Sequence, residues 1–262
     1  MVLCVPRFCQ KGEPMEAFAK LITSIAALVG AVAWPLAIFL IIYVFRAELR
    51  STLSKVPILL DRLRKASLPG LALELDRVAD AEAACGTDKS GNITPRQIEA
   101  ATRIQTQEVD SQALLKELDR LCLEYDSLRL SLPSGEKRTR AMTRVIVKMR
   151  SLAPSVIDFL DAYKGSGSAG SRLAAIAMMQ MVPRVADLAW LRDRFSTELP
   201  FLLYHAALAL QNVANVSDTP AKKKQLRDVV KSALDTVKSF SGVPDQGTVE
   251  VLSTLLASLP EN

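Results

Sequence analysis

The sequence feature that most constrains this chain is an apolar run of 25 residues, 21–45, that holds no charged side chain. A helix rises about 1.5 Å per residue, so about 20 residues cross the hydrocarbon core of a bilayer. A signal-peptide core is only about 7–15 residues long, and no small-x-small cleavage site with a polar start follows this run. The run therefore predicts a permanent transmembrane helix, bent near Trp34 and Pro35.

The basic residues beside the run predict its orientation. Three precede it and six follow it closely: Arg7, Lys11 and Lys20, then Arg46, Arg50, Lys55, Arg62, Arg64 and Lys65. Cytoplasmic flanks carry the excess of Lys and Arg. Residues 1–20 are therefore expected outside and the rest of the chain in the cytoplasm. Translation from Met15 instead of Met1 would strengthen this bias, and the sequence leaves both starts open.

Composition favours a mainly α-helical fold with one membrane span and one or two small domains. Leu and Ala are the two commonest residues, and aromatic residues make up only 5%, which argues against an all-β core. The net charge of +5 is dispersed, whereas nucleic-acid binding needs a concentrated basic stripe. The four cysteines are scattered without a CxxC pair, as expected in a reducing compartment.

Residues 46–93 are predicted to form a juxtamembrane helix, a short strand and a turn. The helix carries apolar residues at heptad spacing, and it either pairs chains or lies on the membrane surface. Leu71, Leu73 and Leu75 alternate with Ala72 and Glu74, which predicts a short strand that pairs with another copy of the chain.

The stretch GTDKSGNITPRQ looks like a calcium loop but lacks its ligands. With Gly91 at the loop glycine, Gly86 takes position 1 and Gln97 takes position 12, where an EF-hand needs carboxylates. The better interpretation is a turn at 90–92 followed by a helix that starts with Thr94 as N-cap and Gln97 completing a capping box.

The region 94–164 is predicted to be long and helical. Apolar residues keep heptad phase from Ile104 to Leu132, with Gln107 and Ser111 as polar interruptions. A coiled coil and one long helix of an ordinary bundle both fit this pattern. The candidate oligomerisation residues are Leu49, Leu53, Leu60, Leu63, Leu114, Leu118, Leu121 and Leu128.

Two further patterns point to partner binding. The most basic stretch beyond the membrane flank starts at Lys137 and ends at Arg150; it is either a solvated helix face or a docking face for an acidic partner or anionic lipid. After a Gly/Ser connector at 165–170, the triplet Ala174, Ala175 and Ala177 recurs 32 residues later, and a fixed offset is typical of stacked helix pairs.

The order of these segments resembles HEAT-like helical repeats. It is also similar to a poorly characterised bacterial family of single-span membrane proteins found near signalling and conflict proteins. The resemblance rests on RTRAM at 138–142, GSRLAA at 170–175, WL at 190–191, ELPF at 198–201 and YHAALAL at 204–210. It implies a HEAT-like repeat domain over 171–262 and an address at the bacterial inner membrane.

No residue pattern indicates catalysis. His205 is the only histidine and sits on an apolar helix, so a packed side chain is expected rather than a metal ligand or a base. No phosphate-binding glycine loop is present, and no cofactor is expected. The candidate partner-binding residues are Arg138, Arg140, Arg144, Lys148, Arg150, Arg172, Trp190, Arg194 and Tyr204.

The sequence therefore predicts a membrane-anchored cytoplasmic adaptor or regulator that is not an enzyme. Its partners would be the lipid bilayer and a cytoplasmic protein, with a homo-oligomer as a further form. The alternative is an effector that oligomerises through its heptad leucines and perturbs the bilayer, as in a bacterial conflict system.

Overall fold

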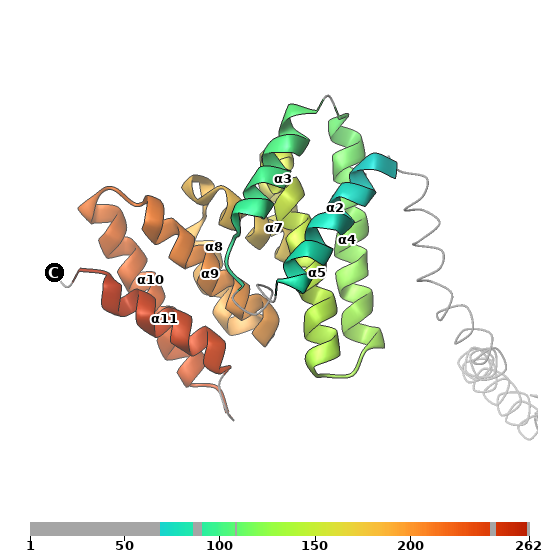
Figure 1. The fold of residues 1–262 in the computed structure, drawn as a ribbon. Coiled ribbons are helices and arrows are strands. Elements are labelled where there is room, and N and C mark those ends of the chain that lie inside the picture. The colour runs from blue at the N-terminus through green and yellow to red at the C-terminus, as the bar shows by residue number, and fades with distance from the viewer. Residues whose placement is uncertain (1–68, 86–90, 108, 242–244, 261–262) are drawn as a thin grey trace, which may run out of the picture. The chain divides into compact units, whose positions relative to one another are not determined.

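The computed structural model describes residues 69–85, 91–107, 109–241 and 245–260, which are mainly helical and contain no strand (Figure 1). The helices are α2 (Pro69–Ala84), α3 (Pro95–Thr106), α4 (Ser111–Ser131), α5 (Glu136–Leu152), η2 (Ala153–Phe159), α6 (Leu160–Lys164), α7 (Ala169–Met181), η3 (Pro183–Val185), α8 (Leu188–Thr197), α9 (Pro200–Val216), α10 (Pro220–Lys238) and α11 (Gln246–Ser258). The prediction of a mainly α-helical fold is confirmed for these residues.

The predicted membrane span at 21–45 lies outside the described residues, as do Leu49, Leu53, Leu60 and Leu63. Within the described part, no helix combines the length and the apolar character that a bilayer crossing requires. The membrane span and the heptad spacing of leucines in the juxtamembrane helix therefore stay predictions from the sequence.

The prediction of a strand at 71–75 is wrong, because these residues form the first turns of α2. Leu71 and Leu75 are buried while Leu73 is 71% exposed, so the leucines four apart share one helix face and the middle one faces away. This buried face packs against α5. The alternation of the leucines was a coincidence of spacing, and the contact with α5 decides the conformation.

The helix start at Thr94 is as predicted, whereas Ser90 of the predicted turn lies outside the described residues. Gly91 has a φ of +63°, a conformation that glycine adopts without strain. Thr94 caps α3 by accepting a hydrogen bond from the Gln97 N–H at 3.3 Å. The second half of the predicted capping box does not form in the described structure, because the Gln97 side chain turns inward and accepts from Arg150 at 3.4 Å.

The predicted long helix divides into α3 and α4 at its polar interruption. Gln107 ends α3, and the Asp110 carboxylate starts α4 by accepting from the Gln112 N–H at 3.2 Å. Leu114, Leu118 and Leu121 are buried in the core of the same chain, and Leu128 packs against that core. These four candidate oligomerisation residues are core residues, so the ordinary-bundle alternative holds here.

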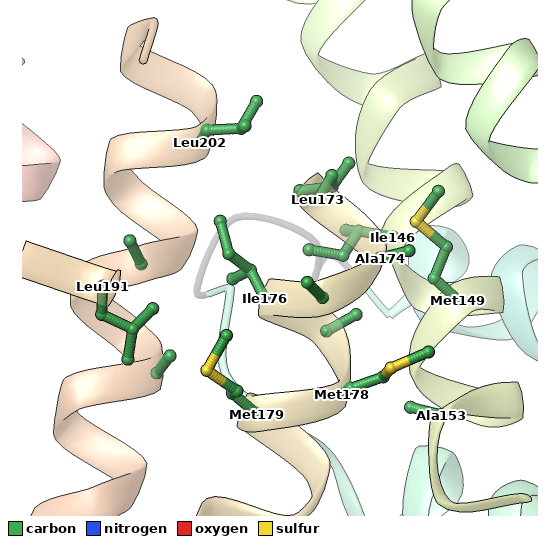
Figure 2. Packing of buried hydrophobic residues seen from close by; sticks show 14 of the residues in the cluster. Ile146, Met149, Ala153, Leu173, Ala174, Ile176, Met178, Met179, Leu191 and Leu202 are labelled. Atoms are coloured by element: carbon green, nitrogen blue, oxygen red, sulfur yellow. The ribbon is translucent and has the colours of Figure 1, made fainter. Parts of the chain in front are cut away.

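Helix α7 occupies the centre of the core and packs against α4, α5 and α9. Figure 2 shows Met178 pointing toward Met149 and Ala153 on one side of α7, and Met179 pointing toward Leu191 on the other. Gly170 allows α7 to approach α4 closely, because a Cβ there would lie 2.7 Å from the Cys122 carbonyl carbon. All six repeated alanines on α7 and α9 are buried, and the two helices contact each other.

The segment 165–170 is anchored to α4. Ser168 caps α7 by accepting from the Ser171 N–H at 3.2 Å, and its hydroxyl donates to Asp126 at 2.6 Å. The Gly170 N–H donates to the other Asp126 oxygen at 2.9 Å. The segment thus lies inside the same compact unit as the other described helices.

Candidate functional site

A groove of about 1090 Å³ lies where the end of α4 and the start of α5 face the starts of α9 and α11. Helix α4 contributes side chains from its end and α5 from its start, whereas α9 and α11 contribute side chains as far along as Gln211 and Thr254. The described lining residues are Tyr125, Arg129, Ser134, Glu136, Arg138, Thr139, Arg140, Met142, Thr143, Leu199, Pro200, Phe201, Tyr204, His205, Gln211, Asp245, Gly247, Glu250, Val251 and Thr254.

The floor of the groove is a row of four rings. The Phe201 ring centroid lies 5.8 Å from that of Tyr125 and 4.5 Å from that of His205, and Tyr204 follows at 5.4 Å from His205. The two contacts of His205 are edge-to-face, which is an arrangement that aromatic rings prefer. Burial raises the pKa of Tyr125 to about 12, so this floor is uncharged at neutral pH.

Tyr204 is held between two glycines, Gly91 in the loop before α3 and Gly247 in the first turn of α11. A Cβ on Gly91 would lie 2.9 Å from the Tyr204 hydroxyl oxygen, and a Cβ on Gly247 would lie 3.4 Å from its Cε2. Contacts this close leave no room for a larger residue at Gly91 without a shift of the ring. The loop at Gly91 and the first turn of α11 therefore set the position of the Tyr204 ring in the groove.

The α4–α5 wall carries two arginines that form no ion pair within the described part of the chain. Arg129 donates to the Tyr125 hydroxyl at 3.4 Å, and Arg138 donates to the Leu132 carbonyl at 3.3 Å and to Ser134 at 2.7 Å. All three acceptors are neutral, and neither arginine forms an ion pair with a described residue. Arg140 differs because it pairs with Glu136 at 2.6 Å.

The opposite wall, at the start of α11, is acidic. Asp245 caps α11 by accepting from the Thr248 N–H at 2.9 Å, and Glu250 is exposed on the next turn. Counted over the described lining, the groove has three arginines and three carboxylates. Its lining is therefore neutral in sum and divided into a wall with unpaired positive charge and a wall with negative charge.

Beneath the floor lies a buried polar network centred on Arg150. Its guanidinium donates to the Gln180 side chain at 2.7 Å and to the Gly91 carbonyl at 2.7 Å, in addition to the weaker Gln97 contact. Gln180 in turn donates to the His205 carbonyl at 2.6 Å. Burial lowers the pKa of Arg150 to about 10, so the side chain stays charged at neutral pH.

His205 joins this network to the groove. Its Nδ1 lies 3.3 Å from Nη2 of Arg150, and a guanidinium can only donate. Burial and the Arg150 charge hold the pKa of His205 well below its usual value, so the ring is neutral. A neutral ring whose Nδ1 accepts must carry its proton on Nε2.

The structure gathers three of the nine candidate partner-binding residues in this groove, namely Arg138, Arg140 and Tyr204. The other three candidate cations of the basic stretch lie outside the groove lining and have partners within the chain. Arg144 pairs with Asp80 and Lys148 pairs with Asp76 at 2.7 Å, both on α2. Arg150 is fully buried.

The remaining three candidates join neighbouring helices. Arg172 and Arg194 both pair with Glu198, and the Arg194 guanidinium lies 4.7 Å from the Trp190 ring centroid. The Trp190 indole N–H donates to the Lys164 carbonyl at 3.3 Å. These contacts fix α7 and α8 relative to each other, and they account for the three side chains without a partner protein.

Sequence reasoning missed most of the groove. Arg129, Phe201, Asp245 and Glu250 stand in ordinary helical context, and no local spacing relates residues of α4 to residues of α11. The prediction that His205 is a packed side chain is confirmed. Among the described residues, no three His, Cys, Asp or Glu side chains converge as they would to hold a metal ion.

Comparison with known proteins gives no family assignment. The chain matches no protein-family model, no curated protein and no solved structure.

Proposed function

We propose that this chain is a membrane-anchored adaptor that binds a segment of a partner protein in the groove. The observation that carries the proposal is the pair of arginines, Arg129 and Arg138, held beside an aromatic floor with only neutral acceptors. A guanidinium in such a place favours a carboxylate ligand, which it binds through charge-assisted hydrogen bonds.

The lining also defines the rest of the partner segment. Leu199, Phe201 and Val251 offer apolar surface between the two walls, which suits apolar side chains in the middle of the segment. The acidic wall at Asp245 and Glu250 suits a basic side chain at its other end. A doubly charged phosphate group would meet three carboxylates in the same lining, so a segment with one acidic and one basic residue fits better.

The membrane part of the proposal rests on the sequence. The apolar run at 21–45 would hold the helical unit at the inner face of a bacterial membrane, and the HEAT-like arrangement of α7 to α11 is part of the same proposal. The alternative effector function has less support, because the described heptad residues Leu114, Leu118 and Leu121 are buried within the chain.

The proposal is tested by photocrosslinking the full chain in its own cells. A photoreactive amino acid replaces Val251 in the groove, and a matched variant carries it at Leu130, which is 90% exposed on α4 and outside the groove. We expect the groove position to crosslink one recurrent protein through a segment with acidic and apolar residues, and the Leu130 position not to do so.

Charge reversal then tests the role of the arginines. Arg138→Glu should lower the crosslink yield at least fivefold, while Arg184→Glu, an exposed change on η3, should leave it unchanged. Lysine in place of the acidic residue of the partner should restore the yield with Arg138→Glu. Equal crosslinking from the two probe positions, or a yield indifferent to Arg138→Glu, would refute the adaptor groove.

A further inference from the structure

His205 presents a hydrogen-bond donor at the groove floor that no described residue accepts. The ring lines the groove, and its only hydrogen bond within the described structure is the one at Nδ1. The Nε2–H is fixed as the donor because Arg150 occupies the other nitrogen. The edge-to-face contacts with Phe201 and Tyr204 hold the ring plane.

The surroundings of this donor define the group that would accept from it. The neighbouring rings of Phe201 and Tyr204 are apolar, and Arg129 and Arg138 provide the site for a carboxylate elsewhere on the lining. A neutral donor among apolar rings suits a neutral acceptor, and the neutral acceptor that every peptide carries is the backbone carbonyl.

We propose that His205 is a binding residue whose Nε2–H donates to a backbone carbonyl of the docked segment and so fixes the register in which the segment binds. Arg150 is the positioning residue, because it sets the tautomer from below. The inference rests on the proposed function and deepens it. A segment that brings a methyl group or an N–H to the floor would bury the His205 donor without an acceptor, and we expect this to weaken binding about tenfold.

Two substitutions of His205 distinguish the loss of its hydrogen-bond donor from a loss of folding. His205→Asn retains an acceptor at the Nδ1 position for Arg150 but withdraws the donor from the groove, whereas His205→Gln can reach the Nε2 position. The probe is a decapeptide selected from a random display library on the full chain. Weaker binding of the decapeptide to the Arg138→Glu variant confirms that it binds in the groove. Circular dichroism and thermal unfolding verify that both variants fold.

The decisive measurement exchanges single backbone carbonyls of that decapeptide for thiocarbonyls, which are weaker acceptors. We expect one position at which the exchange raises Kd several-fold for the native chain and for His205→Gln, but leaves Kd for His205→Asn unchanged. Nitrogen NMR of the single histidine should show a protonated Nε2 whose signal shifts when the peptide binds.

The outcomes test the role of His205 separately from the proposed adaptor function. A groove-binding decapeptide whose thiocarbonyl profile is the same for the native chain and His205→Asn overturns the role of His205 and leaves the adaptor function standing. A protonated Nδ1 also overturns it. A library without any groove-binding peptide overturns the adaptor function and the role of His205 with it.

Discussion

Nη2 of Arg150 lies 3.3 Å from Nδ1 of His205, and both side chains are buried. A buried cation beside a basic ring is tolerated here because the guanidinium also donates to the Gly91 carbonyl and to two glutamine side chains. The pairing has two consequences: it keeps His205 neutral, and it ties α3, α5, α7 and α9 together at one point. Each consequence can be measured.

The stability of the fold should fall in mild acid because of His205. Its folded-state pKa is lowered by burial and by the Arg150 charge, whereas in the unfolded chain it returns to about 6.5. Below about pH 6.5 the unfolded chain therefore binds the extra proton, and the free energy of unfolding decreases by about 2 kcal/mol at about pH 5. Urea unfolding of the full chain between about pH 7 and 5 measures this slope.

The control is His205→Gln, which removes the only histidine of the chain. Its free energy of unfolding should lack the slope in the same window, even where its value at neutral pH differs from that of the native chain. Parallel slopes for the two proteins would contradict the neutral buried ring.

Arg150 should contribute far more to the free energy of unfolding than Arg140, which lies on the same helix. Arg150→Ala leaves a cavity and removes the donor from several buried acceptors, so we expect a loss of about 3–5 kcal/mol. Arg140→Ala breaks only an exposed pair with Glu136, which should cost under about 0.5 kcal/mol. Chemical denaturation at neutral pH compares the two, and similar losses would argue against the buried network.

Gly170 should tolerate no side chain. An added Cβ would overlap the Cys122 backbone, so Gly170→Ala must push α7 away from α4, at a cost of about 1–3 kcal/mol. Gly167→Ala is the matched change, since nothing lies within 4 Å of its Cβ position, and it should change stability little. Thermal unfolding distinguishes them; an unaffected Gly170→Ala would show that the two helices do not meet as described.

The heptad-spaced leucines of α4 should stabilise the fold of a single chain and should not join two chains. Leu118→Ala removes a fully buried side chain, and we expect about 2–5 kcal/mol of destabilisation with no change in the self-association of the folded chain. Leu130→Ala, at an exposed site of the same helix, should be close to neutral. Sedimentation and denaturation of both variants check this, and dissociation of an oligomer by Leu118→Ala at unchanged stability would favour the coiled coil.

Helix content and several helix starts could be predicted from local chemistry. Thr94 and the turn at Gly91 are set by residues within a few positions of each other, so the sequence contains all the information needed. The leucines at 71–75 could not be assigned in this way, because a spacing of two residues also places the first and third leucines four apart on a helix. Only the surface of α5 decides between the two conformations.

The same error concealed the ion pairs of the basic stretch. Asp76 and Asp80 lie one helical turn apart on α2, and so do Arg144 and Lys148 on α5; the two pairs match when the helices pack together. A strand at 71–75 leaves the aspartates that follow without a helical face that could match these cations. A charge run on a helix indicates a solvated face only when no acidic helix lies against it.

The groove itself depends on tertiary contacts. Arg129 and Glu250 line one site, yet no local signal relates positions so far apart in the chain. His205 was correctly predicted to be packed, but its second role depends on Arg150, whose burial contradicts the ordinary expectation for an arginine. Such an exception is visible only in the structure.

The balance of charge along the groove lining bears on how a partner would arrive. Three positive and three negative groups in one lining largely cancel beyond about 8 Å at physiological ionic strength, so the groove itself adds little long-range steering. Added salt should therefore change the association rate little, while it weakens the contacts at Arg129 and Arg138 once the segment is seated. Discrimination between partners would then lie in how long each one stays bound.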